Sequence, residues 1–84
     1  MFITVKPSIF IDALQLELSA RAGNYFRGVL RDDSGSVCST LEKNIQNEKE
    51  QFTWTGLSHL PYGRYTIEVS QGDDQMMMNL VKRI

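Results

Sequence analysis

Apolar and polar residues alternate along most of this 84-residue chain. The clearest runs are Leu14–Ser19 and Tyr65–Ser70, in which every second residue is apolar. Successive side chains of a β-strand point to opposite faces, so this period of two predicts strands that bury one face. An opening segment, Phe2–Val5, is a further candidate strand that breaks near Pro7. Similar alternation continues in four other runs: 25–31, 37–42, 52–55 and 76–84.

Short segments rich in Gly, Pro and Asp separate these runs. In the segment 32–35, Gly35 can adopt a positive φ, and Asp32 can accept hydrogen bonds from nearby backbone N–H groups. In the segment 60–63, Pro61 restricts φ and Gly63 closes the turn. We predict turns at these two places and at two others: 22–24 and 71–74.

The polar stretch Glu42–Gln51 contains one apolar residue, Ile45, and we interpret it as a long loop or a frayed turn. Short strands at intervals of roughly 8–12 residues are typical of an all-β sandwich or barrel. Two packed sheets would bury the leucine stripe, whereas one open sheet would leave it exposed. We therefore predict a single all-β domain over residues 1–84, an immunoglobulin-like Greek-key sandwich of six to seven antiparallel strands.

The composition narrows the possible functions. Nine Lys and Arg residues stand against ten Asp and Glu residues, which gives a formal net charge of −1. This balance argues against sequence-independent binding of nucleic acid. The single cysteine, Cys38, excludes a disulfide framework, and the single histidine, His59, excludes the common zinc-binding patterns. The sequence shows no apolar run long enough to span a membrane and no signal peptide.

No catalytic constellation is evident, and we expect a protein that is not an enzyme and holds no cofactor or metal. The pairs Asp32–Asp33 and Asp73–Asp74 are expected to cap backbone amides in turns. A weak Ca²⁺ site is the alternative, although Ca²⁺ needs about 6–8 oxygen ligands. Cys38 is interpreted as a half-buried structural thiol rather than a nucleophile. His59 is interpreted as a surface-loop residue rather than a catalytic base.

The aromatic residues and the methionines can each be interpreted either as core residues or as part of a binding surface. Phe52 and Trp54 share one strand parity, which favours core packing over an exposed platform for sugars. A glycan site would need Trp54 exposed together with Tyr62. The run Met76–Met78 places two side chains on one face of a strand and one on the other. These methionines are either adaptable core residues with one surface member or a soft contact surface for a partner.

Several motifs follow one another in a characteristic order. A proline-containing segment, 5–7, precedes the leucine strand, and an aliphatic strand leads into the turn 32–35. The motif Leu60-Pro61-Tyr62-Gly63-Arg64-Tyr65 then leads into an isoleucine and valine strand, and Lys82-Arg83 stands near the end. Over nearly the whole chain, this order resembles the C-terminal sorting domain of cargo proteins of the type IX (Por) secretion system of Bacteroidetes-type bacteria.

The resemblance implies a non-catalytic domain that serves as a secretion signal. Such a domain would belong to a longer exported protein that passes from the periplasm to the cell surface or is secreted. Its partners would be proteins of the outer-membrane secretion machinery, with no nucleic acid and no membrane insertion. The implied recognition surface is the last strand, with four candidate contact residues: Met77, Lys82, Arg83 and Ile84.

Strand addition at the edge of the sheet is one mode in which that last strand could be recognised. An edge strand that carries methionines could also support a homodimer. The alternative function is an immunoglobulin-like accessory or adhesion module that binds a glycan or a protein partner. The motif residues at the turns are expected to shape the fold: Asp32, Gly35, Pro61, Gly63 and Tyr65.

Overall fold

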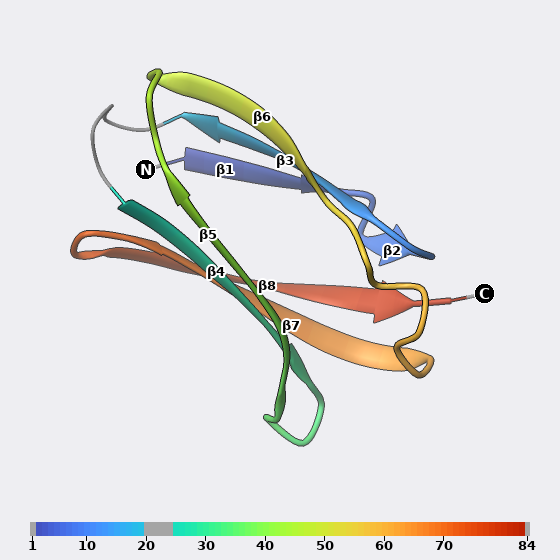
Figure 1. The fold of residues 1–84 in the computed structure, drawn as a ribbon. Coiled ribbons are helices and arrows are strands. Elements are labelled where there is room, and N and C mark those ends of the chain that lie inside the picture. Colours follow the sequence, from blue (N-terminus) through green and yellow to red (C-terminus); the bar gives the residue numbers. More distant parts are fainter. Residues whose placement is uncertain (1, 20–24, 84) are drawn as a thin grey trace.

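A computed structural model describes residues 2–19 and 25–83 of the chain. These residues form β-strands and no helix, and the strands lie in two sheets (Figure 1). One sheet has the order β1-β3-β6, and the other has the order β2-β8-β7-β4-β5. The strands are β1 (Phe2–Lys6), β2 (Ile9–Phe10), β3 (Leu14–Ser19), β4 (Tyr25–Asp32), β5 (Val37–Asn44), β6 (Lys49–Trp54), β7 (Gly63–Gln71) and β8 (Asp74–Lys82).

The two sheets face each other and share one hydrophobic core, as the sequence predicts for a β-sandwich. The period of two holds in β3 and β7, where alternate side chains are buried. Each fully buried aliphatic side chain contributes roughly 1.5–3 kcal/mol relative to an exposed one. The largest fully buried side chains are Phe10, Phe26, Leu14, Leu16, Leu30, Ile45, Leu57, Ile67 and Val69.

The strand count and the uniform antiparallel pairing are corrected by the structure. Eight strands lie within the described residues rather than six or seven. The additional strand is β2, which pairs in parallel with β8 through Ile9↔Val81 and Phe10↔Lys82. The chain reaches β2 directly from β1, after a cis peptide bond at Lys6–Pro7. A strand of two residues is too short for a period of two to reveal it.

The prediction of a long loop over Glu42–Gln51 is wrong. β5 continues to Asn44 and β6 begins at Lys49, so only residues 45–48 connect them. Backbone pairing with β4 and β3 holds the polar ends of these strands, which hydrophobic alternation does not reveal. In the connection, the Glu50 carboxylate accepts hydrogen bonds from the backbone N–H groups of Gln46 and Asn47, at 2.7 and 3.0 Å.

The turn predicted at 32–35 is confirmed. Asp32 Oδ1 accepts hydrogen bonds from the backbone N–H groups of Ser34 and Ser36, each at 3.0 Å, and Gly35 has a φ of 89°. The turn at 71–74 is also confirmed, and Gly72 has the positive φ, 60°, that a type II′ hairpin needs at its first central position. The turn predicted at 22–24 lies outside the described residues.

Tyr65 anchors the segment that leads from one sheet to the other. Its hydroxyl donates a hydrogen bond to the backbone carbonyl of Pro61, at 2.6 Å, four residues upstream. The ring is buried and packs edge-on against Phe10, with 5.9 Å between the ring centroids. Burial raises the pKa of the Tyr65 phenol. The Leu-Pro-x-Gly-x-Tyr motif therefore shapes the corner that precedes β7.

We expect Tyr65→Phe to lower the free energy of unfolding by about 1 kcal/mol, the usual net contribution of one hydrogen bond. Tyr62→Phe is the matched control, because Tyr62 lies in the same motif but its side chain is 63% exposed. Urea titration of the native protein and both variants measures the difference. Equal stabilities for the two variants would show that the corner bond contributes nothing.

We also expect stability to fall in acid because of Asp32 and Glu50. The hydroxyl of Ser34 and the backbone N–H of Ser36 lower the pKa of Asp32 below 3.8. The backbone N–H groups of Gln46 and Asn47, followed by Lys43, lower the pKa of Glu50 below 4.5. The unfolded chain thus takes up these protons first, so the stabilisation present at neutral pH is lost as the pH falls through these folded-state values.

The measurement compares urea midpoints at neutral pH with those at about pH 3, where unperturbed carboxyl groups are largely protonated. Asp32→Asn and Glu50→Gln should each reduce the drop in midpoint, since each removes one of the titrating groups. An unchanged drop in both variants would assign the acid sensitivity to other carboxylates.

Candidate functional site

Among the described strands, one side of β8 leaves backbone groups without a strand partner over most of its length, as do the outer sides of the edge strands β1, β5 and β6. β7 pairs with β8 along its whole length, from Gly63↔Lys82 to Gln71↔Asp74. On the other side β2 pairs only with Val81 and Lys82. Within residues 2–19 and 25–83, no further strand pairs with that side. We call the segment 75–79, seen from this side, the open edge.

The direction of the free backbone groups follows from the bonds that β2 makes. Val81 N–H donates to Ser8 and Arg83 N–H donates to Phe10, each at 2.9 Å. Odd-numbered residues of β8 therefore turn their backbone groups away from β7, because these groups alternate along a strand. Gln75, Met77 and Asn79 consequently present N–H and C=O groups to the open edge.

The side chains along the open edge divide between two faces. Met77 is 67% exposed on the outer face, between the exposed side chains of Gln75 and Asn79. Met76 and Met78 are half-buried on the inner face and pack against the core. The predicted division of the three methionines is confirmed. Apolar, polarisable sulfur thus flanks the free backbone on both faces.

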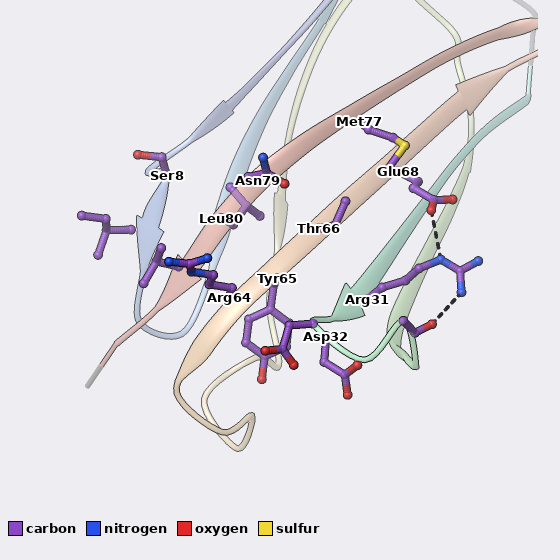
Figure 2. Close-up of a pocket in the computed structure, with 14 residues that line it drawn as sticks. Ser8, Arg31, Asp32, Arg64, Tyr65, Thr66, Glu68, Met77, Asn79 and Leu80 are labelled. Carbon is purple, nitrogen blue, oxygen red and sulfur yellow. Dashed lines mark hydrogen bonds and ion pairs between the residues drawn. The ribbon is translucent and has the colours of Figure 1, made fainter.

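A shallow pocket extends from the open edge across the outer face of the five-stranded sheet (Figure 2). Met77 and Asn79 of β8 line it beside Thr66 and Glu68 of β7. Arg31 of β4 forms an ion pair with Glu68, at 3.1 Å from Nε to Oε1, and donates from Nη1 to the backbone carbonyl of Gly35, at 3.0 Å. An ion-paired polar group therefore lies beside Met77, since Glu68 stands opposite it in the pairing of β7 with β8.

Arg64 lies toward the other end of the pocket, near β2 (Figure 2). It stands opposite Val81 in the pairing of β7 with β8, and its side chain is exposed. Arg83 is also exposed, just beyond the end of β8. Positive charge therefore gathers at the end of β8 that β2 covers.

The structure separates the predicted recognition residues. Lys82 is 3% exposed, and its ammonium group donates to the carbonyl of Arg83, at 2.9 Å, and lies 5.7 Å from the ring centroid of Tyr62. Lys82, one of the four candidate contact residues, is therefore buried rather than accessible. Lys82 shares the parity of Met78 and Leu80, so the alternation along this strand predicts that its side chain points to the core. Met77 and Arg83 are exposed, and Ile84 lies outside the described residues.

Trp54 is part of the core. It is 3% exposed, and its Nε1–H donates to the hydroxyl of Ser39, at 3.0 Å. Tyr62 is exposed, as expected for its turn position, but it has no aromatic partner in Trp54. The structure therefore excludes the glycan platform that would combine Trp54 with Tyr62.

The remaining candidates take the places expected from the sequence. Cys38 is half-buried, with Sγ 3.6 Å from the carbonyl of Ser36, and His59 is exposed in the connection before β7.

In the part of the chain that the structure describes, no group of three or more His, Cys, Asp and Glu side chains is arranged to hold a metal ion. The same residues include no helix of the length and apolarity that a membrane span requires.

No model of a known protein family matches the sequence. No curated protein matches it either.

We expect the fluorescence of Trp54 to report a buried indole. Its emission should be blue-shifted in the native protein, weakly quenched by acrylamide, and unchanged when soluble glycans are added, because the ring is enclosed by the core. The urea-unfolded chain provides the reference for an exposed indole. A saturable change in native emission on addition of a glycan would restore the glycan-binding hypothesis.

Proposed function

We propose that this chain is a non-catalytic sorting domain, recognised by the outer-membrane machinery of a type IX secretion system. The order of the sequence motifs supports the family, and the open edge of β8 supports the mode of recognition. As part of a longer exported protein, such a domain would act between the periplasm and the cell surface.

We further propose that the sandwich belongs to the immunoglobulin-like Greek-key class. The chain changes sheets five times: between β1 and β2, β2 and β3, β3 and β4, β5 and β6, and β6 and β7. Connections that cross from one sheet to the other are typical of Greek-key sandwiches. The bond from the Tyr65 hydroxyl to the Pro61 carbonyl matches the tyrosine corner found near the start of one strand in these folds.

The observation that carries the functional proposal is the accessibility of the last strand. A folded signal must be readable without unfolding, and an open edge offers its backbone groups for strand addition. Met77 adds an adaptable apolar contact beside those groups. Arg83 adds an exposed positive charge at one end. Recognition through these features requires no catalytic group.

The second candidate function is an accessory or adhesion module that binds a protein partner. The open edge favours it for the same physical reason, since strand addition does not depend on the identity of the partner. The two functions differ in what they require from the cell. Only the sorting function depends on the type IX machinery.

The test uses a reporter fusion that carries an export signal, a fluorescent protein and this domain. We expect surface display in a bacterium with the type IX system and none in the isogenic strain that lacks it. Met77→Glu and Arg83→Glu should each reduce display about tenfold, as the loss of roughly 1.4 kcal/mol of recognition energy would. Protease accessibility on intact cells measures the displayed fraction.

Gln51→Glu is the control for this experiment, because Gln51 is exposed on β6 in the other sheet. Point substitution is preferable to deletion of the last residues, since Lys82 is buried and its loss would disturb packing. Melting curves of the purified domains exclude unfolding as a cause. Display that does not depend on the secretion system, or that neither substitution affects, would overturn the sorting proposal.

A further inference from the structure

The five residues of the open edge form a chemical palindrome. They are Gln75, Met76, Met77, Met78 and Asn79: an amide, three thioethers and an amide. None of them carries a charge, and none is a proline. Natural edge strands usually include charged residues or prolines, because these prevent pairing with another chain. This edge lacks that protection over its whole open length.

We propose that the open edge binds a second copy of this chain, which adds its own β8 antiparallel about a two-fold axis at Met77. The inference goes beyond the sorting function and does not rest on it. Antiparallel pairing about Met77 places each residue of the palindrome opposite a residue of the same chemical kind. Amide faces amide and methionine faces methionine.

The backbone groups fit this register. Gln75, Met77 and Asn79 point their N–H and C=O groups outward, as the bonds from Val81 and Arg83 to β2 indicate. Met77 would lie opposite Met77 of the second copy, and Gln75 opposite Asn79 of the second copy. Each such pair exchanges two hydrogen bonds in an antiparallel ladder. All outward groups of the open edge would thus find partners.

Neighbouring registers satisfy fewer groups. A shift of two residues in one direction would require the N–H of Val81, which already donates to Ser8. A shift in the other direction would require Asp73, which lies in the turn between β7 and β8. The register centred on Met77 is therefore the one that uses all three outward-facing residues.

The side chains and charges favour the same arrangement. On the outer face, two Met77 side chains would cover each other, and each is 67% exposed in the single chain. On the inner face, Met76 would lie opposite Met78 of the second copy. Asp73 of the second copy would fall opposite Val81, whose place in the sheet Ile9 of β2 already fills, so the turn of the second copy would have to bend out of the sheet there. Bent in this way, its exposed carboxylate would approach the exposed Arg64 and Arg83. The two-fold interface is closed, so assembly stops at the dimer.

Cysteine cross-linking tests the register directly, in a chain that carries Cys38→Ser. Met77→Cys should form a disulfide-linked dimer on mild oxidation, because paired Cα atoms about 5.5 Å apart suit a disulfide. Gln75→Cys and Asn79→Cys should cross-link when mixed and should not when each is alone. Cross-linking with any other pattern would overturn the register.

Charge substitution tests the association itself. Sedimentation equilibrium of the native chain should show twice the 9.6 kDa mass of one chain, with a concentration dependence and weakening by salt. Met77→Lys and Met77→Glu should each be monomeric alone, since like charges would face each other, and a mixture of the two should form dimers. Thr40→Lys, exposed on β5, is the matched control and should dimerise normally.

Two outcomes would overturn the inference. The first is a native chain that remains at 9.6 kDa at every concentration that its solubility permits. The second is a dimer that persists in the Met77→Lys variant. If the open edge binds a strand of another protein instead of a second copy, the native chain alone would remain monomeric, which is the first of these outcomes. A monomeric chain whose reporter fusion is still displayed would overturn only this inference, whereas a dimer whose fusion is not displayed would overturn only the sorting function.

Discussion

The indole of Trp54 joins the two sheets, and the arrangement of the core depends on it. Trp54 belongs to β6 in the three-stranded sheet, but its ring reaches Gly28 of β4 in the five-stranded sheet. A Cβ atom on Gly28 would lie only 3.0 Å from Cζ3 of the ring, so glycine makes room for the indole. The bond from Nε1–H to Ser39 of β5 satisfies its one polar group. A small domain without a disulfide relies on such close packing for its stability.

Once the inner faces are committed to the core, the groups that remain for binding lie on the outer faces and at the edges. β7 is buried between β8 and β4, so its backbone groups are used within the sheet. β8 differs because β2 covers only two of its residues. The chain reaches β2 from β1, and the rest of that side of β8 has no neighbour among the described strands. The accessible backbone is thus a consequence of where the chain changes sheets.

The sequence predicts the parts of this structure that follow from burial. Leu14, Leu16 and Leu18 alternate because their strand has one core face, and the same parity places Lys82 inside with Leu80. Lys82 is charged, but its position in the strand rather than its charge determines that it is buried. The parallel pairing of β2 could not be predicted, since two residues carry no period. The polar ends of β5 and β6 depend on backbone pairing between distant segments, which side-chain patterns do not encode.

The two proposals for β8 concern the same backbone groups, so the two partners are mutually exclusive. The N–H and C=O groups of Gln75, Met77 and Asn79 can bond to one added strand at a time. Self-pairing would therefore cover the edge until a partner with stronger contacts replaced the second copy. Methionine suits such an exchange, because its flexible thioether side chain adapts to different neighbours. An uncharged open edge favours aggregation. In this arrangement the second copy would cover the edge until the partner binds it.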